Sequence, residues 1–131
     1  MERRLLENRC RPADYLLAVA DRHYPALLES TLPGQRQGRY SILSWNPFKK
    51  LTVTDDGILV EYFRKGGERR RSRRPFRVMS QEFSSHRLPR STAPDLPFCG
   101  GVIGYFSYDL RHWIERLPRR CKYDIHAPDA V

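Results

Sequence analysis

Three side chains that could bind a charged small molecule lie close together in the sequence. Glu29 and Ser30 stand side by side at the end of the apolar stretch ALLES, and Arg39 follows after a loop that contains proline and glycine. A carboxylate can pair with an ammonium group, a guanidinium can pair with a carboxylate, and a hydroxyl adds a hydrogen bond. A buried free α-amino acid requires such partners for both of its charges. The alternative is that Glu29 and Ser30 only cap a helix or a turn.

Two other patterns lead to site hypotheses that we set aside. Gly100, Gly101 and Gly104 do not have the G-x-G-x-x-G spacing of a dinucleotide-binding loop, and no βαβ unit surrounds them. We therefore expect these glycines to allow close packing of a strand. His112 and Glu115 can share one helix face, but no third ligand accompanies them in the sequence. An exposed ion pair is expected there, and not a metal site.

Cysteine usage and hydropathy favour a reduced, cytoplasmic setting. The three cysteines are odd in number and form no C-x-x-C pair, so neither a disulfide framework nor a zinc site is expected. The N-terminal MERRLLENRC does not have the sustained apolar core of a signal peptide. No apolar run approaches the length that a membrane span requires, so no membrane association is expected.

The positive charge of this protein is concentrated in one segment. The chain has 131 residues and a net charge of +9, and the five arginines of the burst Arg69–Arg74 supply more than half of that excess. One hypothesis is a small basic module that binds nucleic acid through its phosphate groups. The alternative is a solvated return after a hairpin, the usual role of a charge run. The second is favoured, because nucleic-acid domains interleave aromatic and basic residues, and no aromatic residue lies between Phe63 and Phe76.

The hydrophobic pattern predicts an α+β fold, with an antiparallel β-sheet or sandwich flanked by helices, in one domain over residues 1–131. Proline in the first turn and apolar residues at helical spacing predict two helices, over 12–23 and 75–88. Asp109 is placed to cap a third helix over 109–118.

Strands are predicted at several places along the chain. The β-rich runs 50–54 and 58–64, joined by Asp55-Asp56-Gly57, predict a hairpin whose turn uses the glycine. Further strands are expected over 24–30, over 39–45, over 98–108, and where the chain approaches Val131. The apolar positions of all these elements predict a core of Leu16, Val19, Leu43, Val53, Ile58, Val60, Val102, Ile103, Tyr105 and Ile114.

Several segments together resemble a known family. ALLES, GRYSILSWNPF, PFCGGVIGYFSYDL, IERLP and a late APD occur in the order and spacing of the N-terminal domain of component I of anthranilate synthase and aminodeoxychorismate synthase. Together they cover about residues 12–131. The resemblance implies a β-sandwich in which the first two segments form one side of an L-tryptophan pocket. Carried over by position, the implied tryptophan-binding residues are Leu28, Glu29, Ser30, Gln37, Gly38, Arg39 and Tyr40.

The resemblance also implies a larger parent protein. In that family the domain that binds chorismate and Mg²⁺ is C-terminal, and nothing in this sequence matches it. We therefore expect a truncated N-terminal domain that is not catalytic by itself and has no cofactor of its own. The parent would aminate chorismate with ammonia from a glutamine amidotransferase subunit, component II. L-Tryptophan would be a feedback inhibitor in the anthranilate (tryptophan) branch or a structural ligand in the para-aminobenzoate (folate) branch, and both branches stay open.

Overall fold

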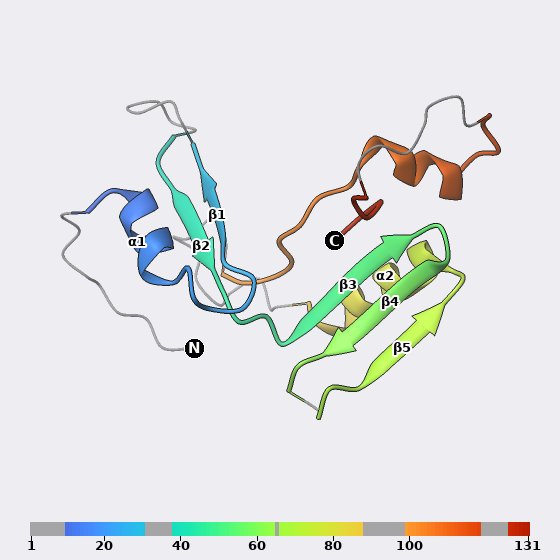
Figure 1. Ribbon diagram of the computed structural model, residues 1–131, viewed down its shortest axis with the longest axis horizontal. Coiled ribbons are helices and arrows are strands. Elements are labelled where there is room, and N and C mark those ends of the chain that lie inside the picture. Colours follow the sequence, from blue (N-terminus) through green and yellow to red (C-terminus); the bar gives the residue numbers. More distant parts are fainter. Residues whose placement is uncertain (1–9, 31–37, 65, 88–98, 119–125) are drawn as a thin grey trace. The chain divides into compact units, whose positions relative to one another are not determined.

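The computed structural model describes residues 10–30, 38–64, 66–87, 99–118 and 126–131 (Figure 1). The chain divides into two compact units, with the boundary between Pro47 and Phe48. Both units combine helical turns with antiparallel strands, which confirms the predicted α+β class and the antiparallel pairing. The expected sandwich, and a single domain over 1–131, stay predictions.

The first unit begins with a short helix. Helix α1 (Pro12–Ala18) has its proline in the first turn, and the Arg11 N–H donates a hydrogen bond of 2.9 Å to the Asp14 carboxylate. The same carboxylate therefore lies near the N-terminus of the helix, where negative charge is favourable. The hydrogen bond and the positive charge of Arg11 hold the pKa of Asp14 below its ordinary value.

Helix α1 ends earlier than the predicted range 12–23. The reason is a tertiary contact: the His23 N–H donates to the Asn46 side-chain oxygen (3.1 Å), and the His23 carbonyl accepts the Asn46 N–H (2.8 Å). The backbone leaves the α-helical region at Val19, which has a φ of −118° and a ψ of 15°, and Tyr24 has a φ of 51°. The pairing with Asn46 replaces the last predicted turn of helix.

Two predicted strands of the first unit are confirmed in shortened form. Strand β1 (Ala26–Glu29) pairs antiparallel with β2 (Ser41–Ser44), and α1 packs against both. A two-stranded sheet with one short helix buries little apolar surface. Accordingly, none of the described residues of this unit is fully buried.

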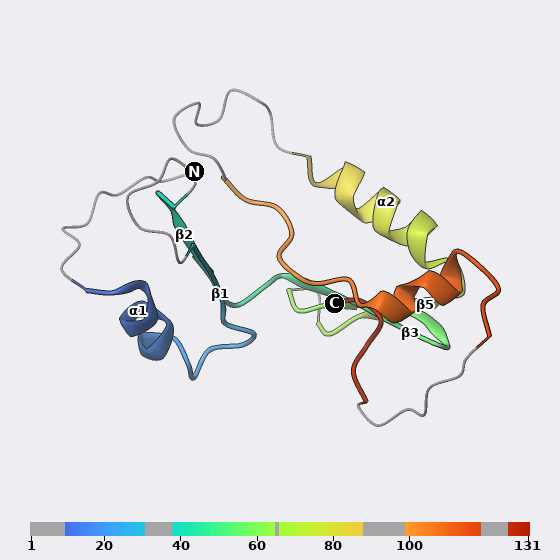
Figure 2. The same ribbon diagram turned by 90° about the horizontal axis from the view of Figure 1, so that it is seen from above.

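The second unit is a three-stranded antiparallel sheet covered on one face by a helix (Figures 1 and 2). Strands β3 (Lys49–Thr54) and β4 (Gly57–Tyr62) form the predicted hairpin, with Asp55 and Asp56 in the turn. Helix α2 (Pro75–Ser85) confirms the predicted second helix and ends three residues before residue 88. It packs against β4 through Val78 and Met79.

The arginine burst is partly a strand, and its arginines are exposed, which agrees with the predicted solvated return after a hairpin. Strand β5 (Arg69–Ser72) pairs with β4 and places Arg70 opposite Val60 and Arg71 opposite Leu59. Because side chains alternate along a strand, neighbouring arginines point to opposite faces of the sheet. The burst therefore does not form one continuous basic face.

The predicted strand over 98–108 is wrong. The described part of that range contains no strand and makes one isolated bridge, from Phe106 to Ala130. Gly100 and Gly101 have φ values of 136° and 151°, which interrupt the extended run. The expected close packing is found at Gly104, where a Cβ would overlap the carbonyl oxygen of Val131.

The expected strand near Val131 consists only of isolated bridges. Ala130 bridges Val53 of β3 on one side and Phe106 on the other. The Val53 N–H donates to the Ala130 carbonyl (2.8 Å), and the Val53 carbonyl accepts the Asp129 N–H (2.8 Å). This short segment thereby joins residues 105–107 to the edge of the sheet.

The predicted third helix over 109–118 is also corrected. The chain forms a 3₁₀ helix, η1 (Tyr108–Trp113), in its place. A 3₁₀ helix has three residues per turn, so the face that packs inward differs from that of an α-helix. Leu110 is buried, but Ile114, which was predicted for the core, is 69% exposed.

The core lies between α2, the sheet and η1 of the second unit. Of the predicted core, Val53, Ile58 and Val60 are buried, Leu16, Val19, Leu43 and Ile103 are half-buried, and Val102, Tyr105 and Ile114 are exposed. The three errors come from the strand and the helix that do not form. The buried apolar residues outside the predicted core list are Val78, Met79, Leu110 and Ala130. Within the described ranges, no helix is long and apolar enough to cross a membrane.

Candidate functional site

One end of the β1–β2 sheet brings together groups expected to bind an amino acid. Glu29, the last residue of β1, lies in register with Ser41, the first residue of β2. Ser30 directly follows Glu29, and Tyr40 directly precedes Ser41. Antiparallel pairing thus places a carboxylate, two hydroxyls and a phenol at the same end of the sheet. This end can offer ion pairing and hydrogen bonding to a ligand.

Arg39 adds a positive charge at this end. Its guanidinium carbon lies 5.7 Å from the centre of the Tyr40 ring, which is a cation–π contact. Leu28 is 50% exposed and Tyr40 44% exposed, while Gly38 is half-buried. The apolar parts of Leu28 and Tyr40 are therefore open to solvent within the described residues. Gln37 lies outside the described residues.

The partner of His112 differs from the one that the sequence suggested. His112 Nε2 lies 3.7 Å from Asp109 Oδ1, so the neighbour of His112 is Asp109 and not the expected Glu115. Across the described ranges, no group of three or more His, Cys, Asp or Glu side chains could hold a metal ion.

A cluster of charged groups that the sequence did not predict lies between α2 and the sheet. We call it the Glu82 cluster: Glu82 of α2 forms an ion pair with Lys49 of β3, accepts a hydrogen bond from the Tyr62 hydroxyl (3.1 Å), and pairs with Arg70 of β5 (3.1 Å). The side chains of Lys49 and Glu82 are only 9% and 10% exposed. The four residues of the cluster come from four different elements, so no local motif could have revealed them.

The environment of Glu82 favours its charged form. Burial alone would raise the pKa of Glu82, because a carboxylate loses its hydration there. The hydrogen bond and charge of Lys49 oppose this effect, with further help from Tyr62 and Arg70. The result is a pKa below the ordinary value for glutamate. We interpret the cluster as structural, because it joins the helix to all three strands of the sheet.

Comparison with known proteins identifies relatives of the chain. No family model matches it. It is 33% identical over 121 residues to anthranilate synthase component 1 of Thermus thermophilus, covering 92% of this chain and 24% of the relative. It is 32% identical over 111 residues to anthranilate synthase component 1 of Pseudomonas aeruginosa, covering 84% of this chain and 22% of that protein. It is 28% identical over 115 residues to aminodeoxychorismate synthase component 1 of Klebsiella aerogenes, covering 88% of this chain and 25% of that protein.

The similarity extends over most of this chain but over only a small part of each relative. The chain spans about a quarter of the length of the curated relatives that it matches. The matches include both kinds of component 1 that the sequence motifs resemble, so the resemblance is confirmed.

Proposed function

We propose that this chain, a homologue of component 1 of the anthranilate and aminodeoxychorismate synthases, is the ligand-binding, non-catalytic part of a chorismate-using synthase. The observation that carries the proposal is the 33% identity over 92% of the chain. The whole protein would add ammonia to chorismate and would receive that ammonia from a glutamine amidotransferase subunit, component II. Mg²⁺ would serve the chorismate-binding part, and the protein would work in the cytoplasm.

The ligand that we propose for the end of the β1–β2 sheet is L-tryptophan. Glu29 would pair with its ammonium group, and Ser30 would donate or accept a hydrogen bond at its charged main-chain end. Arg39 and Tyr40 would form the wall beside the ligand. Leu28, Gln37 and Gly38 complete the proposed set. The position of Glu29 and Ser30 beside the start of β2 supports this proposal, because one small ligand could reach both segments.

We expect the purified chain to form no anthranilate and no aminodeoxychorismate from chorismate, with Mg²⁺ and with either ammonia or glutamine. The reason is that no described residues form a metal site, and that the chain spans about a quarter of its relatives. Product can be followed by fluorescence and chromatography, with Thermus thermophilus component 1 as the positive control. Product above the level of a reaction without protein would contradict the proposal of a non-catalytic part.

We expect Ser30→Ala to weaken tryptophan binding about fivefold or more, because one hydrogen bond to a charged ligand contributes about 1 kcal/mol. Leu28 and Tyr40 are exposed, so the chain by itself should bind weakly. The measurement is therefore calorimetry on a chimera in which this chain replaces the matching segment of Thermus thermophilus component 1.

The matched control is Ser44→Ala, at the opposite end of β2 in register with Ala26. It removes the same hydroxyl from the same sheet and should leave the affinity for tryptophan unchanged. Equal affinities of the unsubstituted chimera and its Ser30→Ala form would refute the assignment of Ser30. A folded chimera that binds no tryptophan would refute the pocket as a whole.

A further inference from the structure

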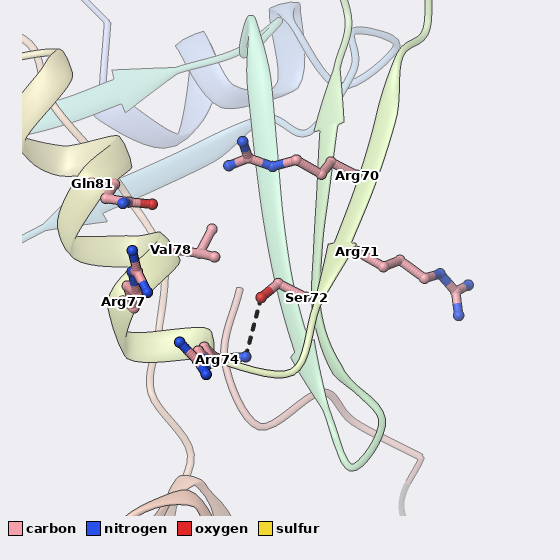
Figure 3. A pocket seen from close by; sticks show the side chains of 7 residues that line it. All are labelled: Arg70, Arg71, Ser72, Arg74, Arg77, Val78 and Gln81. Carbon is pink, nitrogen blue, oxygen red and sulfur yellow. Dashed lines mark hydrogen bonds between the residues drawn. The ribbon is translucent and has the colours of Figure 1, made fainter.

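A hollow lined by arginines lies between β5 and the start of α2 in the second unit (Figure 3). Its volume is about 280 Å³. The residues that line it are Arg70, Arg71 and Ser72 of β5 and Arg74, Arg77, Val78 and Gln81 around α2. Such a volume has room for a small anion with its first waters. This hollow has no part in the tryptophan site proposed above, which lies in the other unit.

The charge of this hollow is positive and incompletely compensated. Arg70 pairs with Glu82 at 3.1 Å. Arg74 and Arg77 have no carboxylate partner in the part of the chain that the structure describes, and the lining contains no acidic residue. The guanidinium groups of Arg74 and Arg77, which can only donate hydrogen bonds, thus line the same hollow as that of Arg70. An anion in the hollow would offset their mutual repulsion.

The position of Arg74 and Arg77 at the start of α2 makes the binding of an anion there more favourable. Arg74 is the N-cap residue, and Arg77 lies in the first turn. The N-terminus of a helix carries partial positive charge, so cations there are unfavourable and anions are favourable. No side chain caps this helix, and its first turn contains no acidic residue. The helix therefore adds to the positive potential that the arginines create.

We propose that this hollow binds a phosphate group, either as inorganic phosphate or on a small phosphomonoester. The planar guanidinium presents paired N–H donors that match phosphate oxygens, and a doubly charged anion best compensates two unpaired arginines. Ser72 accepts the Arg74 N–H through its Oγ (3.2 Å), which leaves the hydroxyl hydrogen able to donate to the ligand. Gln81 provides further amide donors at the rim.

A nucleic-acid backbone fits this surface less well than a small phosphate. Arg71 belongs to the lining, but its side chain extends to the side of the sheet away from α2 (Figure 3). Arg69 pairs with Glu61 at 3.1 Å. The basic residues of β5 are therefore divided between two faces of the sheet. No aromatic side chain lines the hollow, so no base could stack there.

The test is calorimetric titration of the chain with inorganic phosphate, and separately with glycerol 3-phosphate, at constant ionic strength set with chloride. We expect saturable binding of phosphate, and tighter binding of the phosphomonoester would identify it as the natural source. Arg77→Gln should weaken binding about tenfold, because it removes a charged hydrogen-bonding partner. The matched control is Arg71→Gln, at a lining residue whose charged side chain is directed away from α2 (Figure 3). It removes the same charge and should change the affinity less than twofold.

A second variant tests the same hollow without removing an arginine. Gln81→Glu adds a negative charge at an exposed position of α2 and should also weaken phosphate binding about tenfold. Circular dichroism verifies that each variant is folded. Equal losses in Arg71→Gln and Arg77→Gln, or no saturable binding to the unsubstituted chain, would overturn the proposal. Tight binding of a single-stranded oligonucleotide that Arg71→Gln and Arg77→Gln weaken equally would also overturn the proposal and indicate a nucleic-acid surface.

Discussion

Gly57→Ala is expected to lower the free energy of unfolding by about 3 kcal/mol or more, because two independent penalties act at this position. Gly57 has a φ of 125°, a conformation that residues with a side chain rarely adopt. An added Cβ would also overlap the backbone carbonyl oxygen of Ser72 in β5. The β4–β5 pairing would have to open at that point. Urea denaturation of the chain and its variant measures the loss.

Gly66→Ala is the matched control for this prediction. Gly66 has a φ of 63°, but no heavy atom lies within 4 Å of the position of an added Cβ. The control carries the conformational penalty alone, which is about 1–2 kcal/mol for a left-handed residue. A loss for Gly57→Ala no larger than that for Gly66→Ala would show that the close approach to Ser72 does not limit the packing.

Glu82→Gln is expected to lower the free energy of unfolding by about 3 kcal/mol, because it leaves a buried ammonium group without its charged partner. The Lys49 side chain is 9% exposed and cannot regain full hydration in the folded protein. The matched control is Glu61→Gln. Glu61 pairs with Arg69, whose side chain is 71% exposed, so the control should cost less than about 1 kcal/mol. Similar losses in both variants would contradict a special role of the Glu82 cluster.

The same cluster should make stability depend on pH in the acid range. The folded-state pKa of Glu82 lies below its ordinary value, so the unfolded chain binds a proton first as the pH falls. The contribution of Glu82 is therefore complete above the ordinary glutamate pKa of about 4.3 and is lost as the pH falls through the lower folded-state value. Glu82→Gln should flatten the stability profile in that window. An unchanged slope would contradict the assigned pKa direction.

Local patterns in the sequence were sufficient where neighbouring residues determine the structure. The β3–β4 hairpin follows from two β-rich runs around Asp55-Asp56-Gly57, and the glycine takes the positive φ that was expected of it. Helix α2 follows from Pro75 and the apolar spacing after it. The family resemblance rested on motifs such as GRYSILSWNPF, and curated relatives confirm it.

Positions that depend on distant partners could not be predicted in this way. Residues 99–118 contain apolar residues at strand-like and helical spacings, but Gly100 and Gly101 break the extended run, and η1 has a different period from an α-helix. Val102 and Ile114 are consequently exposed. The apolar residues do recur at these spacings, but the strand and the α-helix that would direct them toward the core do not form.

By itself, the sequence indicated the resemblance to component 1, the α+β class, the hairpin and the position of α2. The set of residues proposed for tryptophan came from that resemblance. Only the tertiary structure decided that Arg69–Ser72 would become the edge strand β5, that Glu82 would join α2 to three strands, and that the arginines around Arg77 would line one hollow. The physical reason is that R-R-R-S carries no apolar alternation of its own. Its strand conformation comes from hydrogen bonding to β4, and that pairing then directs each arginine to one face or the other.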